Sequence, residues 1–251
     1  MSGQSKKRLR RIANTSLGEN QVHIWKLRVS NSDKDTEELY KNVLSQDEKE
    51  RADRLRFPGD RVNFVLSRGH LRGLLSKYLN LPAADIEFKY NSYGKPYLNF
   101  ETYPQNIKFN ISHSNDIALY ALALASEVGV DVEYIREVRR AGKIIERFFS
   151  NKERTFYQRQ PAENKMESFF KLWCRREAYA KARGYGLNLP KGDIQISLVP
   201  TEGGYKNYTK DSGGAGASLH DVPVDAGYVA ALAVCGNNPE ILYGELNEPG
   251  Q

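Results

Sequence analysis

The stretch IALYALALASEVGVDVE, residues 117–133, lies in the middle of the 251-residue chain and joins two runs of different chemistry. Its first part, Ile117 to Ala125, is apolar and about half as long as a membrane-spanning helix, so it predicts a buried strand or core segment. Its second part, GVDVE, predicts a strand on which Asp131 and Glu133 point to the same face.

The two acids of this second strand need a positive partner. Side chains two residues apart on a strand are separated by about 7 Å along the backbone. At an effective dielectric constant of 20, the repulsion between two carboxylates at that distance is about 2 kcal/mol. We therefore expect a cation between Asp131 and Glu133.

The composition indicates a folded, basic protein with an anionic partner. Apolar residues make up 40% of the chain, which is long enough for one large domain or two ordinary ones. The net charge of +6 favours nucleic acid, a nucleotide, a membrane surface or an acidic protein as partner. Cys174 and Cys235 form neither a disulfide framework nor a metal-ligand pair by spacing. Because the sequence has no secretory signal and no spanning segment, we expect a cytoplasmic protein without membrane contact.

The first half of the chain predicts a strand, two helices and then a small sheet. The strand is VHIWKLRV, and the first helix is LSQDEKERADRLRF, in which Ser45 and Glu48 have the spacing of a capping box. A second helix follows and ends at Pro82. Short apolar runs between residues 86 and 125 are separated by turn residues, as expected for strands.

The second half follows a similar plan. Ser150 and Glu153 form another capping-box pair, and a long helix covers about residues 164–183. DIQISLV and GYVAALAVCG then predict strands on either side of a loop at residues 202–218. The predicted organisation is a flexible basic tail at residues 1–20, an N-terminal α/β half at residues 21–125 and a C-terminal α/β half at residues 126–251.

The long helix carries a second acidic element. Trp173, Glu177 and Lys181 follow one another at steps of four, so they lie on one stripe of the helix. Two interpretations stay open. Either the helix turns out of the core at Glu177 and its Glu–Lys pair is solvated, or the two residues line a cleft at the edge of the core.

Asp131, Glu133 and Glu177 together offer three oxygen ligands. Such hard donors suit Mg²⁺, or Mn²⁺ in its place, and not Zn²⁺. Because protein-bound Mg²⁺ often shares its ligand shell with substrate phosphates, the trio favours a phosphate-bearing substrate. The rival interpretation is a nucleic-acid-binding module that uses KKRLRR and the arginine-rich residues 49–72. That rival leaves the acids of GVDVE unexplained.

GVDVE followed by WCRREAYAK resembles the 4′-phosphopantetheinyl transferases of the larger, surfactin-synthetase-activating type. Further segments that resemble this family stand in the same order along the chain. They are LSQDEKERADRLRF, DRVNFVLSRGHLR, YGKPYL, FNISHS, RFFSNKE and GYGLNLP. Each segment alone is weak evidence for the family, whereas the ordered set from about residue 40 to residue 190 is strong evidence for it.

The resemblance implies an α+β fold of two pseudo-symmetric α/β halves of similar topology, with coenzyme A and the active site in the cleft between them. It implies transfer of 4′-phosphopantetheine from coenzyme A to a serine of an acyl, polyketide or peptidyl carrier protein, with release of adenosine 3′,5′-bisphosphate. Carriers of fatty-acid, polyketide and nonribosomal-peptide synthesis present a similar serine, and the sequence does not choose among them. We expect a monomer that does not bind nucleic acid.

The resemblance also assigns the chemistry. Asp131, Glu133 and Glu177 would be the magnesium ligands, and Lys181 would contact the phosphate that is attacked. Either Glu177 or a magnesium-polarised water would take the proton of the serine.

A second group of residues would hold the nucleotide phosphates, namely Arg51, Lys95, Ser112 and His113. The sequence departs from the family at Arg176, where a lysine is usual. Arginine presents a planar fork in place of a point charge, so we expect a rearranged phosphate contact at Arg176.

Overall fold

The structure is a computed structural model. It describes residues 9–29, 34–184, 194–195, 205–206, 208–209, 216–236 and 238–246. None of the described helices is long and apolar enough to cross a membrane.

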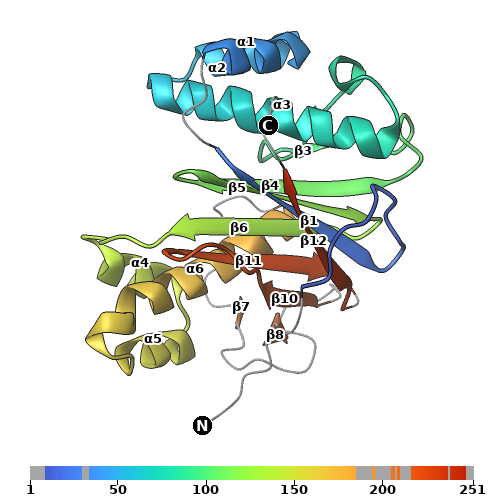
Figure 1. The fold of residues 1–251 in the computed structure, drawn as a ribbon. Helices are drawn as coiled ribbons and strands as arrows, with labels where there is room; N and C mark the ends of the chain where they lie inside the picture. The colour runs from blue at the N-terminus through green and yellow to red at the C-terminus, as the bar shows by residue number, and fades with distance from the viewer. Residues whose placement is uncertain are drawn as a thin grey trace.

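The first half starts with a strand, continues with three helices and ends in an antiparallel pair of long strands (Figure 1). In chain order the elements are β1 (Gln21–Arg28), α1 (Lys34–Val43), α2 (Gln46–Asp53), α3 (Pro58–Leu79), the 3₁₀ helix η1 (Ala83–Asp85), β2 (Lys89–Tyr90), β3 (Pro96–Tyr97), β4 (Ile107–Ser114) and β5 (Ile117–Leu124). The expected strand, both expected helices and the small sheet are confirmed. Helix α3 ends before Pro82, because Asn80 takes the left-handed conformation with φ of 53°.

The second half contains β6 (Val128–Tyr134), α4 (Ala141–Phe148), α5 (Asn151–Gln158), η2 (Ala162–Asn164), α6 (Lys165–Arg183), β7 (Ile194–Gln195), β8 (Tyr205–Lys206), β9 (Tyr208–Thr209), β10 (Ala217–Asp221), β11 (Tyr228–Cys235) and β12 (Glu240–Leu246). The long helix and the GVDVE and GYVAALAVCG strands are confirmed. Most of the expected loop at residues 202–218 lies outside the described residues. Apart from Gly216, its described residues belong to β8, β9 and β10, so the expectation of a loop was wrong for them.

Two sheets of the described residues repeat one strand order. The first is β12-β1-β5-β4 and the second is β6-β11-β10-β8, so β1-β5-β4 corresponds to β6-β11-β10. All neighbours within these two triplets are antiparallel. The predicted α+β fold with two similar halves is confirmed. Strand β12 returns from the end of the chain and pairs in parallel with β1, so the first sheet includes a strand from residues 126–251.

The elements stack in four layers, in the order α3, first sheet, second sheet, α6 (Figure 1). Leu71 and Leu75 of α3 pack on the outer face of the first sheet. The inner faces of the two sheets meet through alternate residues such as Leu119 of β5 and Val130 of β6. Strand β6 therefore lies with one face against the first sheet and the other toward α6.

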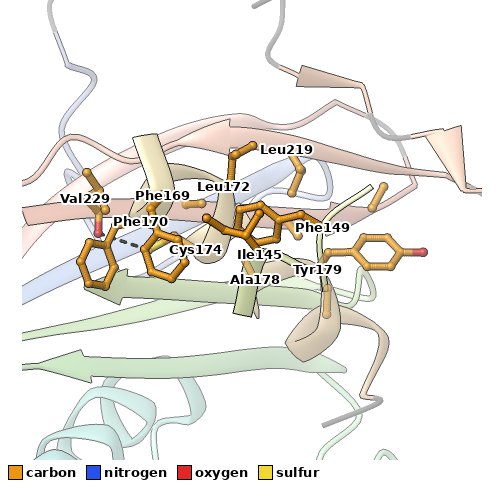
Figure 2. Packing of buried hydrophobic residues seen from close by; sticks show 14 of the residues in the cluster. Ile145, Phe149, Phe169, Phe170, Leu172, Cys174, Ala178, Tyr179, Leu219 and Val229 are labelled. Atoms are coloured by element: carbon orange, nitrogen blue, oxygen red, sulfur yellow. Dashed lines mark hydrogen bonds between the residues drawn. The ribbon is translucent and has the colours of Figure 1, made fainter. Parts of the chain in front are cut away.

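The outermost core joins α6 to the second sheet. Figure 2 shows Phe169, Phe170 and Leu172 of α6 packed beside Leu219 and Val229. Cys174 lies in the same cluster and, like Cys235, is a free thiol. This core fixes α6 along the second sheet and thereby fixes the side chains that α6 presents to β6.

Each half contains the same buried ion pair between its short and long helices. Glu48 closes the capping box of α2 and pairs with Arg72 of α3, with 2.7 Å from Oε2 to Nε. Glu153 closes the capping box of α5 and pairs with Arg176 of α6, with 2.6 Å from Oε2 to Nη2. All four side chains are almost fully buried. The repeated pair is side-chain evidence for the two-half plan that the strand order shows.

Candidate active site

Helix α6 packs directly on the backbone of the GVDVE strand. Gly129, Asp131 and Glu133 alternate with valines that face the first sheet, so these three residues lie on the opposite face. A β-carbon at Gly129 would lie 2.0 Å from the carbonyl oxygen of Ala178 and 2.3 Å from the backbone nitrogen of Ala182. Glycine is required here by the close approach of the helix.

The approach of α6 places Lys181 on Asp131. The Lys181 Nζ lies 2.7 Å from Asp131 Oδ1, 2.8 Å from Ser112 Oγ and 3.2 Å from the carbonyl oxygen of Val130. Arg136 Nη1 lies 3.0 Å from Glu133 Oε2. Each acid therefore has a positive partner of its own, Lys181 for Asp131 and Arg136 for Glu133. A cation between the two acids stays a prediction.

Glu177 lies one turn before Lys181 and is half-buried. Burial, together with repulsion from Asp131, raises the pKa of Glu177 to about 7, and attraction to Lys181 partly opposes this rise. Glu133 also contributes to raising this pKa. Glu177 thus shares one electrostatic cluster with both acids of β6. Because Lys181 bonds across to Asp131, it does not form a solvated surface pair with Glu177. That Glu177 lines a cleft stays a prediction.

The carboxylates fit a divalent cation in their chemistry. In the part of the chain that the structure describes, no three histidine, cysteine or acidic side chains are arranged so that they could hold a metal ion. Lys181 bonds to one oxygen of Asp131, whereas the other, Oδ2, is buried without a hydrogen-bond partner among the residues that the structure describes. A buried, unpartnered carboxylate oxygen beside two further acids suits a cation with oxygen ligands. The ligand set of Asp131, Glu133 and Glu177 stays a prediction.

A cavity of about 240 Å³ lies beside Lys181 and is bounded by both halves of the chain. Four of its lining side chains are cations from four separate segments: Arg51, Arg68, Lys95 and Lys181. Aromatic and small residues complete the wall: Tyr93, Gly94, Pro96, Phe109, Asn110, Ile111 and Gly184. So many positive charges around one cavity indicate an anionic occupant.

Lys95 reaches the cavity from the turn between β2 and β3. Gly94 has φ of 79°, which lets the chain reverse immediately before the lysine. The Lys95 Nζ lies 3.2 Å from Glu127 Oε2 and 3.3 Å from the carbonyl oxygen of Val128, at the start of β6. These contacts tie the turn of the first half to the strand that carries the acids.

Arg68 is a cavity residue that the sequence did not single out. It is only 4% exposed, and its Nε lies 3.3 Å from Glu48 Oε1. Its guanidinium lies over the rings of Phe64 and Phe88, and its Nη1 has no hydrogen-bond partner among the described residues. Burial lowers the pKa of Arg68. The sequence feature that could have indicated Arg68 is its spacing of four residues from Arg72 on α3, which places both arginines on the side of the helix that faces Glu48.

Ser112 and His113 point to opposite sides of β4. Ser112 is buried against β6, where it bonds to Asp131 and Lys181. His113 is exposed, and Lys181, Asp60 and Glu133 are within electrostatic range of its imidazole. Neither residue lines the cavity described above. Their phosphate contacts stay predictions.

Comparison with known proteins shows the family of the chain. A model of the 4′-phosphopantetheinyl transferase superfamily matches residues 127–233, and a model of the 4′-phosphopantetheinyl transferase N-terminal region matches residues 31–127. The 4′-phosphopantetheinyl transferase HetI of a Nostoc species is 34% identical over 223 residues, which cover 89% of this chain and 91% of the relative. The chain belongs to the 4′-phosphopantetheinyl transferase superfamily.

Other members of the superfamily are more distant. The 4′-phosphopantetheinyl transferase Sfp of Bacillus subtilis is 26% identical, over 81% of this chain and 86% of that relative. Among solved structures, the holo-[acyl-carrier-protein] synthase of Thermotoga maritima is 22% identical with a TM-score of 0.36. The match covers 44% of this chain and 63% of that chain.

In this transferase Arg176 does not lie in the cavity. Arg176 is 2% exposed, its Nε and Nη2 lie 3.2 Å and 2.6 Å from the two carboxylate oxygens of Glu153, and its guanidinium packs over the ring of Phe149. The structure therefore replaces the expected phosphate contact of Arg176 with a role in joining α5 to α6. The physical reason is that a bidentate pair with a buried carboxylate uses the planar fork of arginine.

Proposed function

We propose that this chain transfers 4′-phosphopantetheine from coenzyme A to a serine of a carrier protein in the presence of Mg²⁺ and releases adenosine 3′,5′-bisphosphate. One observation carries the proposal. The acids Asp131, Glu133 and Glu177 share a site with Lys181, and Lys181 also lines the cationic cavity. The site therefore joins the two requirements of the reaction, binding of a polyphosphate and removal of a proton.

The cationic cavity supports binding of coenzyme A through its phosphates. Arg51, Arg68, Lys95 and Lys181 reach it from separate segments, and Arg68 has a buried Nη1 without a hydrogen-bond partner in the described part of the chain. Transfer of a phosphoryl group needs charge neutralisation and positioning more than covalent help from the protein. A fixed set of guanidinium and ammonium groups provides both.

Glu177 is the residue suited to accept the proton of the attacking serine. A general base works best when its pKa is near the working pH. Burial and repulsion from Asp131 bring the pKa of Glu177 to about 7. Lys181, one turn along α6, bonds to Asp131 and lines the cavity, where it can contact the phosphate that is attacked.

The predicted metal ligands would be Asp131, Glu133 and Glu177. A bound Mg²⁺ would neutralise charge on the pyrophosphate of coenzyme A. Two features support such a cation: one oxygen of Asp131 is buried with no hydrogen-bond partner among the described residues, and Asp131 and Glu133 are within electrostatic range of Glu177.

The macromolecular partner in this proposal is an acidic carrier protein. The net charge of +6 favours encounter with such a partner, since complementary charges raise association rates. Acyl, polyketide and peptidyl carriers are all candidates. The cytoplasmic location and the monomeric state stay predictions.

Mass spectrometry of carrier proteins tests the proposal. Apo forms of acyl, polyketide and peptidyl carriers are incubated with the enzyme, coenzyme A and Mg²⁺, and we expect a mass gain of one phosphopantetheine arm together with adenosine 3′,5′-bisphosphate in the small-molecule fraction. A carrier whose acceptor serine is replaced by alanine is the negative control, and a parallel reaction with EDTA tests the metal. No mass gain on any carrier class, with folded enzyme, would contradict the proposal.

A further inference from the structure

Strands β4 and β6 lie side by side where the two sheets meet, but no backbone ladder joins them (Figure 1). Three polar side chains from one face of β4 accept hydrogen bonds from the backbone of β6 instead. The bonds run from Val130 N–H to Asn110 Oδ1 (2.9 Å), from Val132 N–H to Ser112 Oγ (3.4 Å) and from Tyr134 N–H to Ser114 Oγ (3.0 Å). Each bond joins residues 20 apart, so the two strands run in the same direction.

The two serines of this row also bind the two acids of β6. Ser112 Oγ donates to Asp131 Oδ1 at 3.0 Å, and Ser114 Oγ donates to Glu133 Oε2 at 3.1 Å. Each serine therefore contacts one carboxylate and the backbone N–H of the residue that follows it. Two contacts from one hydroxyl fix both the position of the strand and the direction of the acid.

The hydrogen-bonding capacity of these hydroxyl groups is used by the protein itself. A serine hydroxyl has one proton to donate. The proton of Ser112 goes to Asp131 and that of Ser114 goes to Glu133, while Lys181 donates a further bond to Ser112 Oγ.

We propose that Ser112 and Ser114 are positioning residues that hold Asp131 and Glu133 in a common orientation for a divalent cation. The inference rests on the proposed function, because it assumes that these acids bind the metal. The reason for the pattern Asn-x-Ser-x-Ser in FNISHS is then geometric. Its alternate residues face the edge of β6, which is the edge strand of the second sheet in the described part of the chain, and each serine there restrains one acid.

Ser114 gives the sharper test, because it does not contact Lys181 in the hydrogen bonds described. Mn²⁺ binding to the full chain without coenzyme A is measured by electron paramagnetic resonance for wild type, S114A, S114T and the control S218A. Loss of a hydrogen bond that orients a metal ligand typically weakens binding 10–100-fold, so we expect S114A to bind Mn²⁺ at least about tenfold more weakly. S114T keeps the hydroxyl and should restore most of the affinity. Ser218 is a strand serine that bonds to His220, so S218A should bind Mn²⁺ as wild type does.

Transfer kinetics separate positioning from substrate contact. The inference requires an unchanged KM for coenzyme A in S114A. Wild-type Mn²⁺ affinity in S114A, with a raised KM for coenzyme A, would show that the serine contacts the substrate and would overturn the inference. If the wild-type protein transfers phosphopantetheine and S114A binds Mn²⁺ with wild-type affinity, only this inference fails. If wild type neither transfers nor binds Mn²⁺, the proposed function fails with it.

A measurement on the wild-type protein avoids any folding defect of the variant. The Tyr134 amide should exchange slowly with deuterium, because it donates to Ser114. Exchange of the Tyr134 amide at the rate of a free amide would show that the bond to Ser114 is not formed, and the inference would then fail.

Discussion

A methyl group at position 129 would collide with helix α6. In G129A the new β-carbon would lie 2.0 Å from the carbonyl oxygen of Ala178, whereas an ordinary carbon–oxygen contact is about 3.3 Å. The helix must therefore retreat by about 1 Å or more. The obstructing atoms belong to the helix backbone, so no side-chain rotation relieves the collision.

The retreat of α6 would separate Lys181 from Asp131. Their 2.7 Å contact would lengthen beyond hydrogen-bond distance, and Glu177 would move with the same helix. A misplacement of about 1 Å can cost about 10²-fold in rate, so we expect a loss of that order in transfer. Overpacking typically costs about 1–3 kcal/mol, so the free energy of unfolding should fall by a similar amount.

The assay is the initial rate of carrier modification by mass spectrometry, at a temperature where thermal denaturation shows G129A to be folded. The matched control is G142A on α4, where no atom lies within 4 Å of the new β-carbon. G142A should keep the wild-type rate and gain about 0.4–1 kcal/mol of stability. If G129A transferred phosphopantetheine at the wild-type rate, the close contact of α6 with the strand would not be what assembles the site.

Four further predictions concern single side chains and pH. E177Q removes the proposed base with little change in shape, so transfer should fall by about 10²–10⁴-fold at an unchanged melting temperature. R68A should raise the KM for coenzyme A by about 10–100-fold, because it removes one hydrogen bond between charged groups. A change in kcat alone would argue against phosphate binding by Arg68. R176M leaves the buried Glu153 without its partner and should lower the free energy of unfolding by about 3–5 kcal/mol in urea titrations. Burial lowers the pKa of three histidines to about 4, namely His23, His70 and His220. In the unfolded chain the histidine pKa is near 6.5, so the unfolded state binds more protons than the folded state between pH 6.5 and pH 4. Each histidine should therefore lower the free energy of unfolding by up to about 3 kcal/mol as the pH falls through that window. A free energy of unfolding that does not change with pH would show that these imidazoles become charged in the folded protein.

The sequence predicted those parts of the structure that local rules determine. The alternation in GVDVE fixed which face Asp131 and Glu133 share, and their repulsion required a nearby cation. The two capping boxes located α2 and α5 because the side chain that caps a helix lies three residues from the residue it contacts. The spacing of four residues on α6 placed Glu177 and Lys181 on one face of the helix, which is also a local rule.

Local rules could not decide which arginines are buried. Arg68 and Arg176 both lie on long helices rich in charge, where an arginine is usually solvated. Arg68 is enclosed by Phe88 and Glu48, and Arg176 by Phe149 and Glu153, all of which come from other elements. The pairing of β12 with β1 is another contact between distant segments, and nothing in EILYGEL itself indicates the sheet that it joins.

The repeated ion pair shows how the two halves divide the chemistry. When α3 and α6 are aligned on Arg72 and Arg176, the residue after each arginine is Gly73 in the first half and Glu177 in the second. The second half therefore carries the acid of the helix together with the acids of β6, whereas the first half supplies Arg51, Arg68 and Lys95 to the cavity. The acids therefore come from the second half, and three of the four cations that line the cavity come from the first. A duplicated scaffold can in this way carry an asymmetric distribution of charge, because only one copy of the long helix has a carboxylate directly after its buried arginine.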